Sequence, residues 1–556
     1  MTTATEAPAA ARRPAALRQA VTLAVATLVL FLVLIQPNHP AAMTWGALRL
    51  FPLELPVILL ALLALPARGA VTAAFRALLV AALMVIAVLK LADYATFIAY
   101  NRGFNVVVDL HLIPAAWNLG SGSIGVGLAG LVVAGALAAL AGVALALWWA
   151  TAVWVRLALP RPARLGAAVL LVPATALAVA EIGQARRAWV LPFDAPGAAF
   201  TARVGWERVQ TVRATLHDLA DFRAAARNDA FTDAGPLFDR LGNADLMIVY
   251  VESYGRASMD NPLYAPTHEA TLREIEDTLA AQGLAMRSGW ARAPMTGGQS
   301  WLAHASVAAG LWIPNQGRYR ALLASPRRTL FHFAQAAGLR TVAIKPAHVF
   351  DWPEGDFFGF DAIYNAADLG YAGDRFNWVT MPDQFVLHAF DRLERAGTPG
   401  TDRAPMLAQI ALISSHAPFL PVPPVIDWDA IGDGTVFNAW ASSGDPPDVV
   451  WRDHDRVREK YRLAVDYSLR ATGAWIERNA DAPALLVVLG DHQAARFIAG
   501  VDGHDVPVHV IGPPELVALI DDWDWTPGMI PDPALPVWPM DWLRDALMRA
   551  TSSGAP

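Results

Sequence analysis

The chain has 556 residues, enough for several domains, and its hydrophobic residues, 55% of the total, are concentrated in the first third. The formal net charge of −7 argues against a nucleic-acid-binding protein, which normally presents a basic face. Cysteine is absent, which excludes disulfides, a thiolate zinc site and a cysteine nucleophile.

Five apolar segments precede residue 190 and predict an α-helical membrane domain over residues 1–190. Most of them approach or exceed the ~20 residues that a helix needs to cross a bilayer. The second segment is short and contains Glu54. A cleavable signal peptide is not expected, because further spans follow the first. The predicted spans are Leu17–Gln36, Phe51–Leu65, Ala73–Tyr94, Ile124–Val155 and Leu165–Ile182.

Arginine is distributed unevenly around these spans. Groups of arginines precede the first span and lie at the second-to-third and fourth-to-fifth connections, whereas the alternate connections hold little more than Arg49 and Arg102. Arg186 and Arg187 after the fifth span oppose this bias but are outnumbered. The positive-inside rule therefore places the N-terminus in the cytoplasm. With five spans, the remainder of the chain is expected on the periplasmic or extracellular side of a bacterial-type cytoplasmic membrane.

Two charged residues, Lys90 and Asp93, lie in the third predicted span with i, i+3 spacing, so they can pair on one helix face. Intramembrane charges indicate function by default. The alternative is a self-paired couple near the outer interface with a snorkelling lysine. Residues 191–240 are expected to form a linker, because the stretch Ala198–Ala234 has apolar residues at helical spacing among charges.

From residue 241 to residue 525, short apolar runs alternate with helical stretches, and a tryptophan-rich arm follows at 526–556. This alternation predicts an α/β domain with a mainly parallel sheet and helices on both faces. The expected strands are Leu246–Ser253, Arg340–Pro346, Met406–His416, Ala484–His492 and Val506–Pro513, and the expected helices are Thr271–Gly283, Thr329–Gly338 and Lys460–Asn479.

Polar residues follow three of these strands. Glu252 ends the first, His416 follows the strand from Met406, and Asp491 and His492 end the strand from Ala484. Open α/β sheets place their sites at the carboxyl ends of strands. Glu252, Asp491 and His492 together suit a divalent ion such as Zn²⁺ or Mn²⁺. Taken alone, Asp491 and His492 after a glycine are also typical of a turn.

A nucleophile is expected in the stretch "TGGQSW", where a glycine-rich turn leads into a predicted helix. Ser300 falls at the helix start, where the helix dipole favours an alkoxide and free backbone N–H groups favour a phosphate. Metal coordination would lower the pKa of the hydroxyl further. Ordinary N-capping is the alternative role of Ser300. Thr296 is a rival nucleophile, but the spacing to the helix favours Ser300.

Five motifs occur in a fixed order: "IVYVESYG", "TGGQSW", "ISSHAPF", "VLGDHQ" and "GHDVPVHVIG". They resemble the alkaline phosphatase/sulfatase superfamily, and most closely its membrane-anchored lipoteichoic acid synthase and phosphoethanolamine transferase branch. Members of that branch have five spans followed by one extracytoplasmic catalytic domain. The resemblance covers residues 245–513 and implies an alkaline phosphatase-like fold with one divalent metal ion, Zn or Mn.

The resemblance also implies roles for individual residues. Glu252, Asp491 and His492 match the metal ligands. Ser300 matches a residue that is usually threonine in the synthases, where it acts as nucleophile and metal ligand. The sequence "SWLAH" lacks the proline and arginine of the sulfatase C/S-x-P-x-R motif, so hydrolysis of sulfate esters is disfavoured.

Substrate contacts are implied in the same way. His416 and His504 match histidines on the substrate side of the site. The synthases carry a phosphate-binding arginine beyond the nucleophile helix, but no arginine occurs in "AIKPAHVFDWPEGDFFGFDAIYN". Lys345 or His348 would serve instead, and Trp352 would line the pocket. Lysine contacts phosphate as a point charge, without the bidentate fork of arginine.

The expected function is a membrane-anchored, metal-dependent transferase. It would move a phospho-headgroup of the phosphoglycerol or phosphoethanolamine type from a membrane phospholipid to an envelope glycan or lipid, through a phosphoserine intermediate. Two alternatives stay open. One is an extracytoplasmic phosphodiesterase, phosphatase or sulfatase-like hydrolase, in which water is the acceptor, and the other is a non-catalytic receptor on the same fold.

Overall fold

The structure is a computed structural model that describes residues 9–100, 102–110, 112–157, 159–350 and 352–556. The chain divides after Asp218 into two compact units. The division falls within the long helix α7, Phe200–Arg227.

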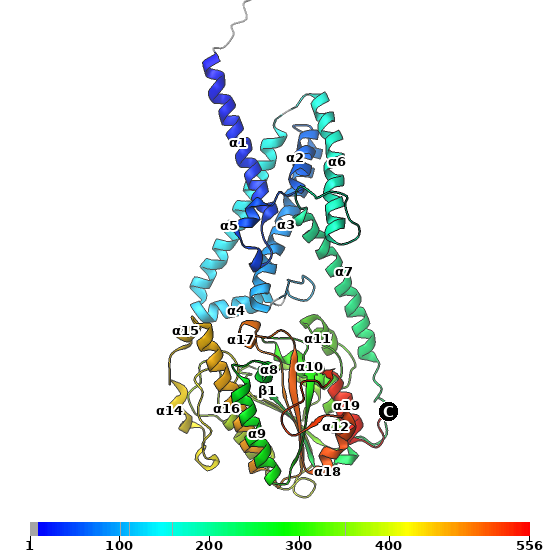
Figure 1. Cartoon of the computed structure of the whole chain (residues 1–556), viewed down its shortest axis with the longest axis vertical. Coiled ribbons are helices and arrows are strands. Elements are labelled where there is room, and N and C mark those ends of the chain that lie inside the picture. The colour runs from blue at the N-terminus through cyan, green and yellow to red at the C-terminus, as the bar shows by residue number, and fades with distance from the viewer. Residues whose placement is uncertain (1–8, 101, 111, 158, 351) are drawn as a thin grey trace, which may run out of the picture. The chain divides into compact units, whose positions relative to one another are not determined.

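The first unit is helical (Figure 1). Four helices in its described part are long and apolar enough to cross a membrane, with apolar stretches at Ala16–Ile35, Ala70–Ile98, Val126–Val155 and Arg161–Ala185. These stretches coincide with four of the five predicted spans. The helices of the unit before α7 are α1 (Ala9–Ile35), α2 (Glu54–Ala64), α3 (Ala70–Tyr100), α4 (Leu112–Ile124), α5 (Val126–Val155) and α6 (Arg161–Ala185).

The predicted number of five spans is not confirmed. The segment Phe51–Leu65 forms only the 11-residue helix α2. At 1.5 Å per residue α2 is about 16 Å long, roughly half of the ~30 Å hydrocarbon core of a bilayer. The helix stops early because Leu65 precedes Pro66, and the residue before a proline is disfavoured in the helical region; Leu65 is extended, with ψ 154°.

The two intramembrane charges of α3 do not pair with each other. Lys90 Nζ donates to Thr201 Oγ1 at 2.8 Å and to the carbonyl of Leu34 at 3.1 Å. Asp93 pairs with Arg208 of α7. The alternative of a self-paired couple is therefore wrong, because both side chains have partners that are far away in the sequence.

Acidic side chains from two other helices bind the start of α7. A carboxylate oxygen of Glu54 on α2 accepts from the backbone N–H of Ala202 at 2.8 Å, and one of Glu181 on α6 accepts from that of Ala199 at 2.9 Å. Helix N-termini have unpaired N–H groups and favour negative charge. The charged groups of the first unit thus stabilise the beginning of the helix that leads into the second unit.

We expect Arg208→Ala to lower the free energy of unfolding of the first unit by about 3–5 kcal/mol, because it leaves the buried Asp93 carboxylate without its charged partner. Thermal unfolding of the detergent-solubilised chain, followed by helical circular dichroism, measures the change. The double variant Arg208→Ala/Asp93→Asn is expected to recover most of the loss. If Arg208→Ala alone melted at the temperature of the parent, the ion pair between Asp93 and Arg208 would not stabilise the first unit.

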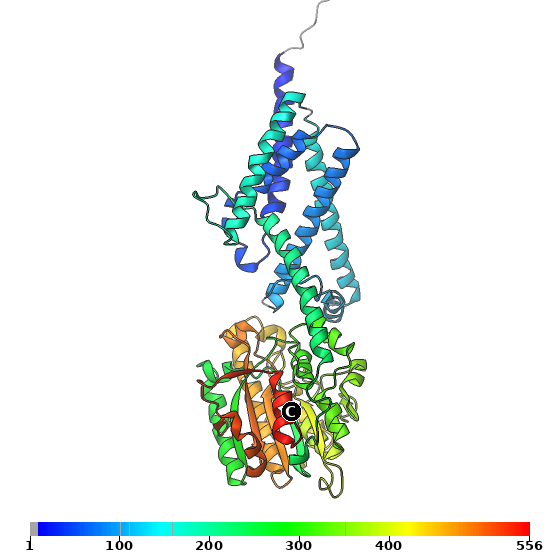
Figure 2. The same ribbon diagram turned by 90° about the vertical axis from the view of Figure 1, so that its right-hand side faces the viewer.

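The second unit is an α/β domain built on one mixed sheet (Figure 2). In the described residues the strand order is β4-β3-β5-β1-β6-β7-β2-β8, with β9 also paired to β2. The strands from β4 to β6 run parallel, whereas β7 is antiparallel to β6 and β2 is antiparallel to β7. The strands are β1 (Asp245–Val251), β2 (Ala285–Arg292), β3 (Arg340–Lys345), β4 (Ala362–Asn365), β5 (Met406–Ala411), β6 (Ala484–Gly490), β7 (Asp505–Gly512), β8 (Thr526–Pro527) and β9 (Val537–Pro539).

Helices cover both faces of this sheet, as predicted. Figure 1 shows α9 and α16 along one face and α10, α12 and α19 along the other. The main core lies between the strands and the helices α9, α13 and α16. The helices are α8 (Ala257–Asp260), α9 (Ala265–Ala281), α10 (Ser300–Ala309), α11 (Gln316–Leu323), α12 (Leu330–Ala336), α13 (Asp383–Glu394), α14 (Asn438–Ala441), α15 (Pro447–Val450), α16 (His454–Arg478), α17 (Arg496–Ala499), α18 (Pro514–Val517) and α19 (Trp542–Thr551).

The parallel part of the sheet brings the candidate site residues to one edge. Strands β3, β5, β1 and β6 are consecutive in the sheet, so their carboxyl ends lie side by side. The register pairs Val251 with Gly490, and therefore Glu252 and Asp491 follow at the same level. Lys345 ends β3, and the loop that carries His416 follows β5.

Candidate metal centre and active site

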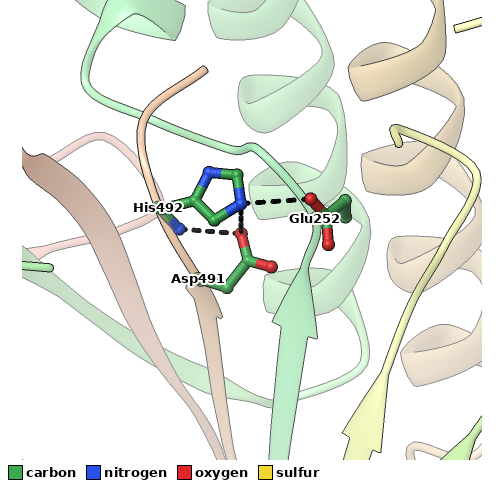
Figure 3. A group of neighbouring side chains, drawn as sticks. All are labelled: Glu252, Asp491 and His492. Atoms are coloured by element: carbon green, nitrogen blue, oxygen red, sulfur yellow. Dashed lines mark hydrogen bonds and ion pairs between the residues drawn. The ribbon is translucent and has the colours of Figure 1, made fainter. Parts of the chain in front are cut away.

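Three buried side chains converge at the ends of β1 and β6 (Figure 3). One ligand atom each of Glu252, Asp491 and His492 lies within 4.8 Å of the others. His492 Nε2 is 3.2 Å from Glu252 Oε1 and 3.9 Å from Asp491 Oδ1. The three residues are 7%, 1% and 1% exposed, so their charges are shielded from water.

The local backbone brings these side chains together. Gly490 has to be glycine, because a Cβ there would lie 1.8 Å from the carbonyl oxygen of Tyr254. Asp491 Oδ1 accepts from the backbone N–H of Ser253 at 2.8 Å, which joins the end of β6 to the end of β1. His492 Nδ1 lies 3.0 Å from the carbonyl oxygen of Gln493. This contact leaves Nε2 as the ligand atom that faces the carboxylates.

The electrostatics of the cluster favour a cation. Burial and the charge of Glu252 raise the pKa of Asp491. Burial works against ionisation of His492, but Asp491 and Glu252 outweigh it and raise the pKa of the imidazole. Burial likewise disfavours the charged form of Glu252, yet His492 holds the pKa of this carboxyl well below its usual range. Two buried carboxylates and an imidazole suit Zn²⁺ or Mn²⁺, which would neutralise the site in place of protons, and the three residues therefore fit a divalent ion.

Ser300 lies beside this cluster. Its Oγ donates to Glu252 Oε2 at 3.0 Å and lies 3.3 Å from His492 Nε2. The helix α10 begins at Ser300, and Gln299 before it adopts a left-handed φ of 69°. The hydroxyl thus faces the cluster and does not cap the helix, so the N-capping alternative is not what the structure shows.

Thr296, the rival nucleophile, lies near the cluster but makes different contacts. It forms an isolated β-bridge with Gln493. Within the described residues its hydroxyl makes no hydrogen bond to Glu252, Asp491 or His492. The geometry therefore favours Ser300.

A cavity of about 320 Å³ opens over Ser300 and Glu252. Four of the five predicted substrate-side residues line it, and His504 does not. His504 Nδ1 lies 3.2 Å from the carbonyl oxygen of Ala293, at the start of β7. The lining residues are Glu252, Gly298, Gln299, Ser300, Trp301, His304, Lys345, Ala347, His348, Trp352, Phe358, Phe360, Gln409, Ala411, Leu412, Ile413 and His416.

The lining residues differ in how they present their polar atoms. Lys345 is 5% exposed, and burial lowers its pKa to about 7. His348 packs edge-on against Trp352 with 5.2 Å between ring centroids, and burial lowers its pKa to about 4. His416 Nδ1 contacts the carbonyl oxygen of Ala417 at 2.6 Å, which leaves Nε2 for other partners.

Two further polar residues of the cavity, His304 and Gln409, lie outside the five sequence motifs. His304 follows Ser300 by four residues, the spacing that places two side chains on one face of a helix, so this signal was present in the sequence. Gln409 lies inside β5 among apolar neighbours, and its position in the cavity follows only from the order of the strands.

No protein-family model and no curated protein matches the sequence. Among the solved structures that the chain matches are lipoteichoic acid synthases and phosphoethanolamine or phosphoglycerol transferases.

Three of them illustrate the likeness. The integral membrane lipooligosaccharide phosphoethanolamine transferase EptA from Neisseria meningitidis is 15% identical, over 86% of this chain and 85% of that chain, with a TM-score of 0.44. The lipoteichoic acid synthase LtaP from Listeria monocytogenes is 16% identical, over 53% and 71%, with a TM-score of 0.35. The periplasmic domain of EptC from Escherichia coli, in complex with Zn, is 14% identical, over 56% and 84%, with a TM-score of 0.36.

Proposed function

We propose that the chain is a membrane-anchored, metal-dependent transferase. It moves a phospho-headgroup from a membrane phospholipid to a glycan or lipid of the cell envelope through a phosphoserine intermediate on Ser300. The observation that carries this proposal is the position of Ser300 Oγ, 3.0 Å from Glu252 Oε2 and 3.3 Å from His492 Nε2 at the wall of the cavity.

Glu252, Asp491, His492 and Ser300 would hold the metal ion. When bound, a divalent ion lowers the pKa of the coordinated hydroxyl and offsets negative charge on the phosphoryl group. The two carboxylates, the ion and one lysine give the cavity a small net charge, which suits a phosphodiester monoanion better than a phosphate monoester dianion.

Transfer takes place in two steps, in which Ser300 is the nucleophile and His416 moves the proton. Ser300 Oγ attacks the phosphorus, the bond to the lipid alcohol breaks, and the headgroup remains on the serine. His416 Nε2 takes up the proton that Ser300 Oγ releases and passes it to the departing alcohol oxygen, so one proton moves from the serine to the lipid alcohol. In the second step an acceptor hydroxyl attacks the phosphoserine and restores the Ser300 hydroxyl. Backbone N–H groups at the start of α10 stabilise the phosphoryl oxygens in both steps.

The anchoring helices support a lipid donor. A chain with four helices able to cross a membrane keeps its cavity close to phospholipid headgroups and so raises their effective concentration. The catalytic unit lies on the periplasmic or extracellular side in this proposal, where envelope glycans and lipids are available as acceptors. This placement requires the short apolar helix α2 to count as a fifth crossing, because four crossings from a cytoplasmic N-terminus would return the chain to the cytoplasm.

Trapping the intermediate tests the proposal. The full chain in detergent is incubated with zinc and phosphatidylglycerol or phosphatidylethanolamine, quenched in acid and digested for mass spectrometry. The expected result is a headgroup phosphate on the peptide that contains Ser300, in the parent and in Thr296→Ala, but not in Ser300→Ala. An adduct on Thr296, or no adduct with either lipid, would contradict the proposal. A headgroup that is released only as the free phosphate, even when glycan or lipid acceptors are added, would favour the hydrolase.

The pH dependence of ligand binding follows from Lys345. Burial lowers its pKa to about 7, and a bound anion raises it again by favouring the ammonium. The charge of a phosphodiester stays constant over this pH range. Its affinity is therefore highest below pH 7, where Lys345 is charged, and falls by about tenfold per pH unit above pH 7, where free Lys345 loses its proton. Titration calorimetry with bis(4-nitrophenyl) phosphate in the Ser300→Ala background measures this slope. Lys345→Arg, which stays charged, is expected to bind with little pH dependence; an equal slope in both chains would exclude Lys345 as its source.

A further inference from the structure

His304 lies one helical turn after Ser300 and lines the same cavity. Its Nδ1 is 3.1 Å from Nζ of Lys345. Its ring packs against that of Tyr250, with 4.1 Å between the centroids, which fixes the orientation of the imidazole. None of the steps proposed above uses this histidine.

Lys345 has an uncommon environment for a buried cation. Its side chain is 5% exposed, and within the described part of the chain it forms no ion pair with a carboxylate. Its partners are His304 Nδ1 and the ring of Trp352, whose centroid is 5.4 Å from Nζ. Buried lysines are usually paired with a carboxylate. Both contact partners here are neutral, and the Asp491 carboxylate attracts the ammonium only from a distance, without an ion pair.

The protonation of His304 follows from the same contact. An ammonium only donates hydrogen bonds, so Nδ1 of His304 accepts and the ring proton lies on Nε2. Burial holds the pKa of His304 well below its usual range, which keeps the imidazole neutral. In the described residues Nε2 has no hydrogen-bond partner, so the contact with Lys345 is the one polar bond that the side chain makes.

We propose that His304 is a positioning residue, a neutral acceptor that directs the Lys345 ammonium toward the phosphoryl oxygens of the substrate and leaves its charge available to them. This inference rests on the proposed function, because it requires an anionic phosphodiester in the cavity. A carboxylate in place of His304 would also hold the lysine but would neutralise it. A lysine on a flexible stem lacks the rigid fork of an arginine and needs an external partner to fix its direction.

Binding of a phosphodiester probe tests this role. The full chain in detergent, loaded with zinc, carries Ser300→Ala so that the probe, bis(4-nitrophenyl) phosphate, is bound and not turned over. Lys345→Ala is expected to raise the Kd by about 10- to 100-fold, the worth of a charge-assisted hydrogen bond. His304→Ala is expected to raise it by about 5-fold, because the ammonium stays in the cavity but is no longer directed at the probe. His304→Asn keeps an acceptor near the position of Nδ1 and is expected to stay within about 2-fold of the parent.

A double-mutant cycle shows whether His304 acts through Lys345. In the Lys345→Ala background, His304→Ala is expected to change the Kd no further. Zinc affinity is expected to be equal in all variants, because His304 is not a ligand. Three results would each overturn the positioning role. The first is that the two substitutions raise the Kd independently, so that their effects multiply. The second is a His304→Asn variant that binds the probe as weakly as His304→Ala, and the third is a loss of zinc affinity in His304→Ala. A parent that binds neither zinc nor the probe would overturn the proposed function itself, whereas a parent that binds both alongside an unchanged His304→Ala would remove only the role of His304.

Discussion

Ser300→Ala is expected to reduce kcat for phospholipid turnover by about 10⁴-fold or more, because removal of a covalent nucleophile leaves only the binding and electrostatic contributions of the site. The hydroxyl faces Glu252 and His492 and has no structural role as a helix cap, so its loss should spare the fold. Release of diacylglycerol from a labelled phospholipid by the reconstituted chain measures the effect. Zinc should still bind through the three remaining ligands.

Two matched variants sharpen this prediction. Ser300→Thr keeps a hydroxyl at the start of α10 and is expected to retain measurable turnover. Thr296→Ala removes the only other hydroxyl in the stretch "TGGQSW" and is expected to be close to the parent. If Ser300→Ala turned over lipid at the rate of the parent, or if Thr296→Ala were the inactive variant, the assignment of the nucleophile would be wrong.

Asp491→Asn is expected to weaken zinc binding by about 100-fold or more. This loss exceeds the roughly 10- to 100-fold loss of metal affinity that is typical when a residue that hydrogen-bonds a metal ligand is replaced. Asp491 is 1% exposed and lies next to a second buried carboxylate, so an uncharged amide there relieves repulsion in the metal-free chain. We therefore expect the metal-free variant to melt at or above the temperature of the metal-free parent, and to lose the rise in Tm that zinc gives the parent.

The control for this prediction is Asp502→Asn, which changes an exposed carboxylate that pairs with Arg496 on the surface of the same unit. Metal content by elemental mass spectrometry and affinity by titration calorimetry give the comparison. Equal zinc affinity in Asp491→Asn and the parent would place the ion elsewhere in the chain.

Local sequence signals predicted much of the fold. Short apolar runs predicted β1, β3, β5, β6 and β7, and long apolar stretches predicted the four helices that are long enough to cross a membrane. The strand β2 was missed because its sequence, "AMRSGWAR", has no strong apolar run and it is stabilised by pairing with β7, β8 and β9. The antiparallel direction of β7 was missed for a related reason, since periodicity within a segment carries no information on its direction in the sheet.

In the candidate site too, some contacts could be predicted from the sequence and others could not. Glu252, Asp491 and His492 could be predicted to meet, because all three follow parallel strands and such ends share one edge of a sheet. In the first unit, the partners of Lys90 and Asp93 could not be predicted, because Thr201 and Arg208 are more than a hundred residues away in the sequence. The contact between Lys345 and His304 likewise depends on how α10 lies beside β3 and β1, which no local pattern encodes.

The most direct measurement of the central claim is an anomalous-difference map, recorded at the zinc absorption edge, from crystals of the full chain grown with zinc. We predict one strong peak bounded by Glu252, Asp491, His492 and the Ser300 hydroxyl, with bond lengths of ~2.0–2.2 Å to nitrogen and oxygen ligands. A zinc-replete crystal with no peak at this position, or with zinc bound only by other side chains, would contradict it.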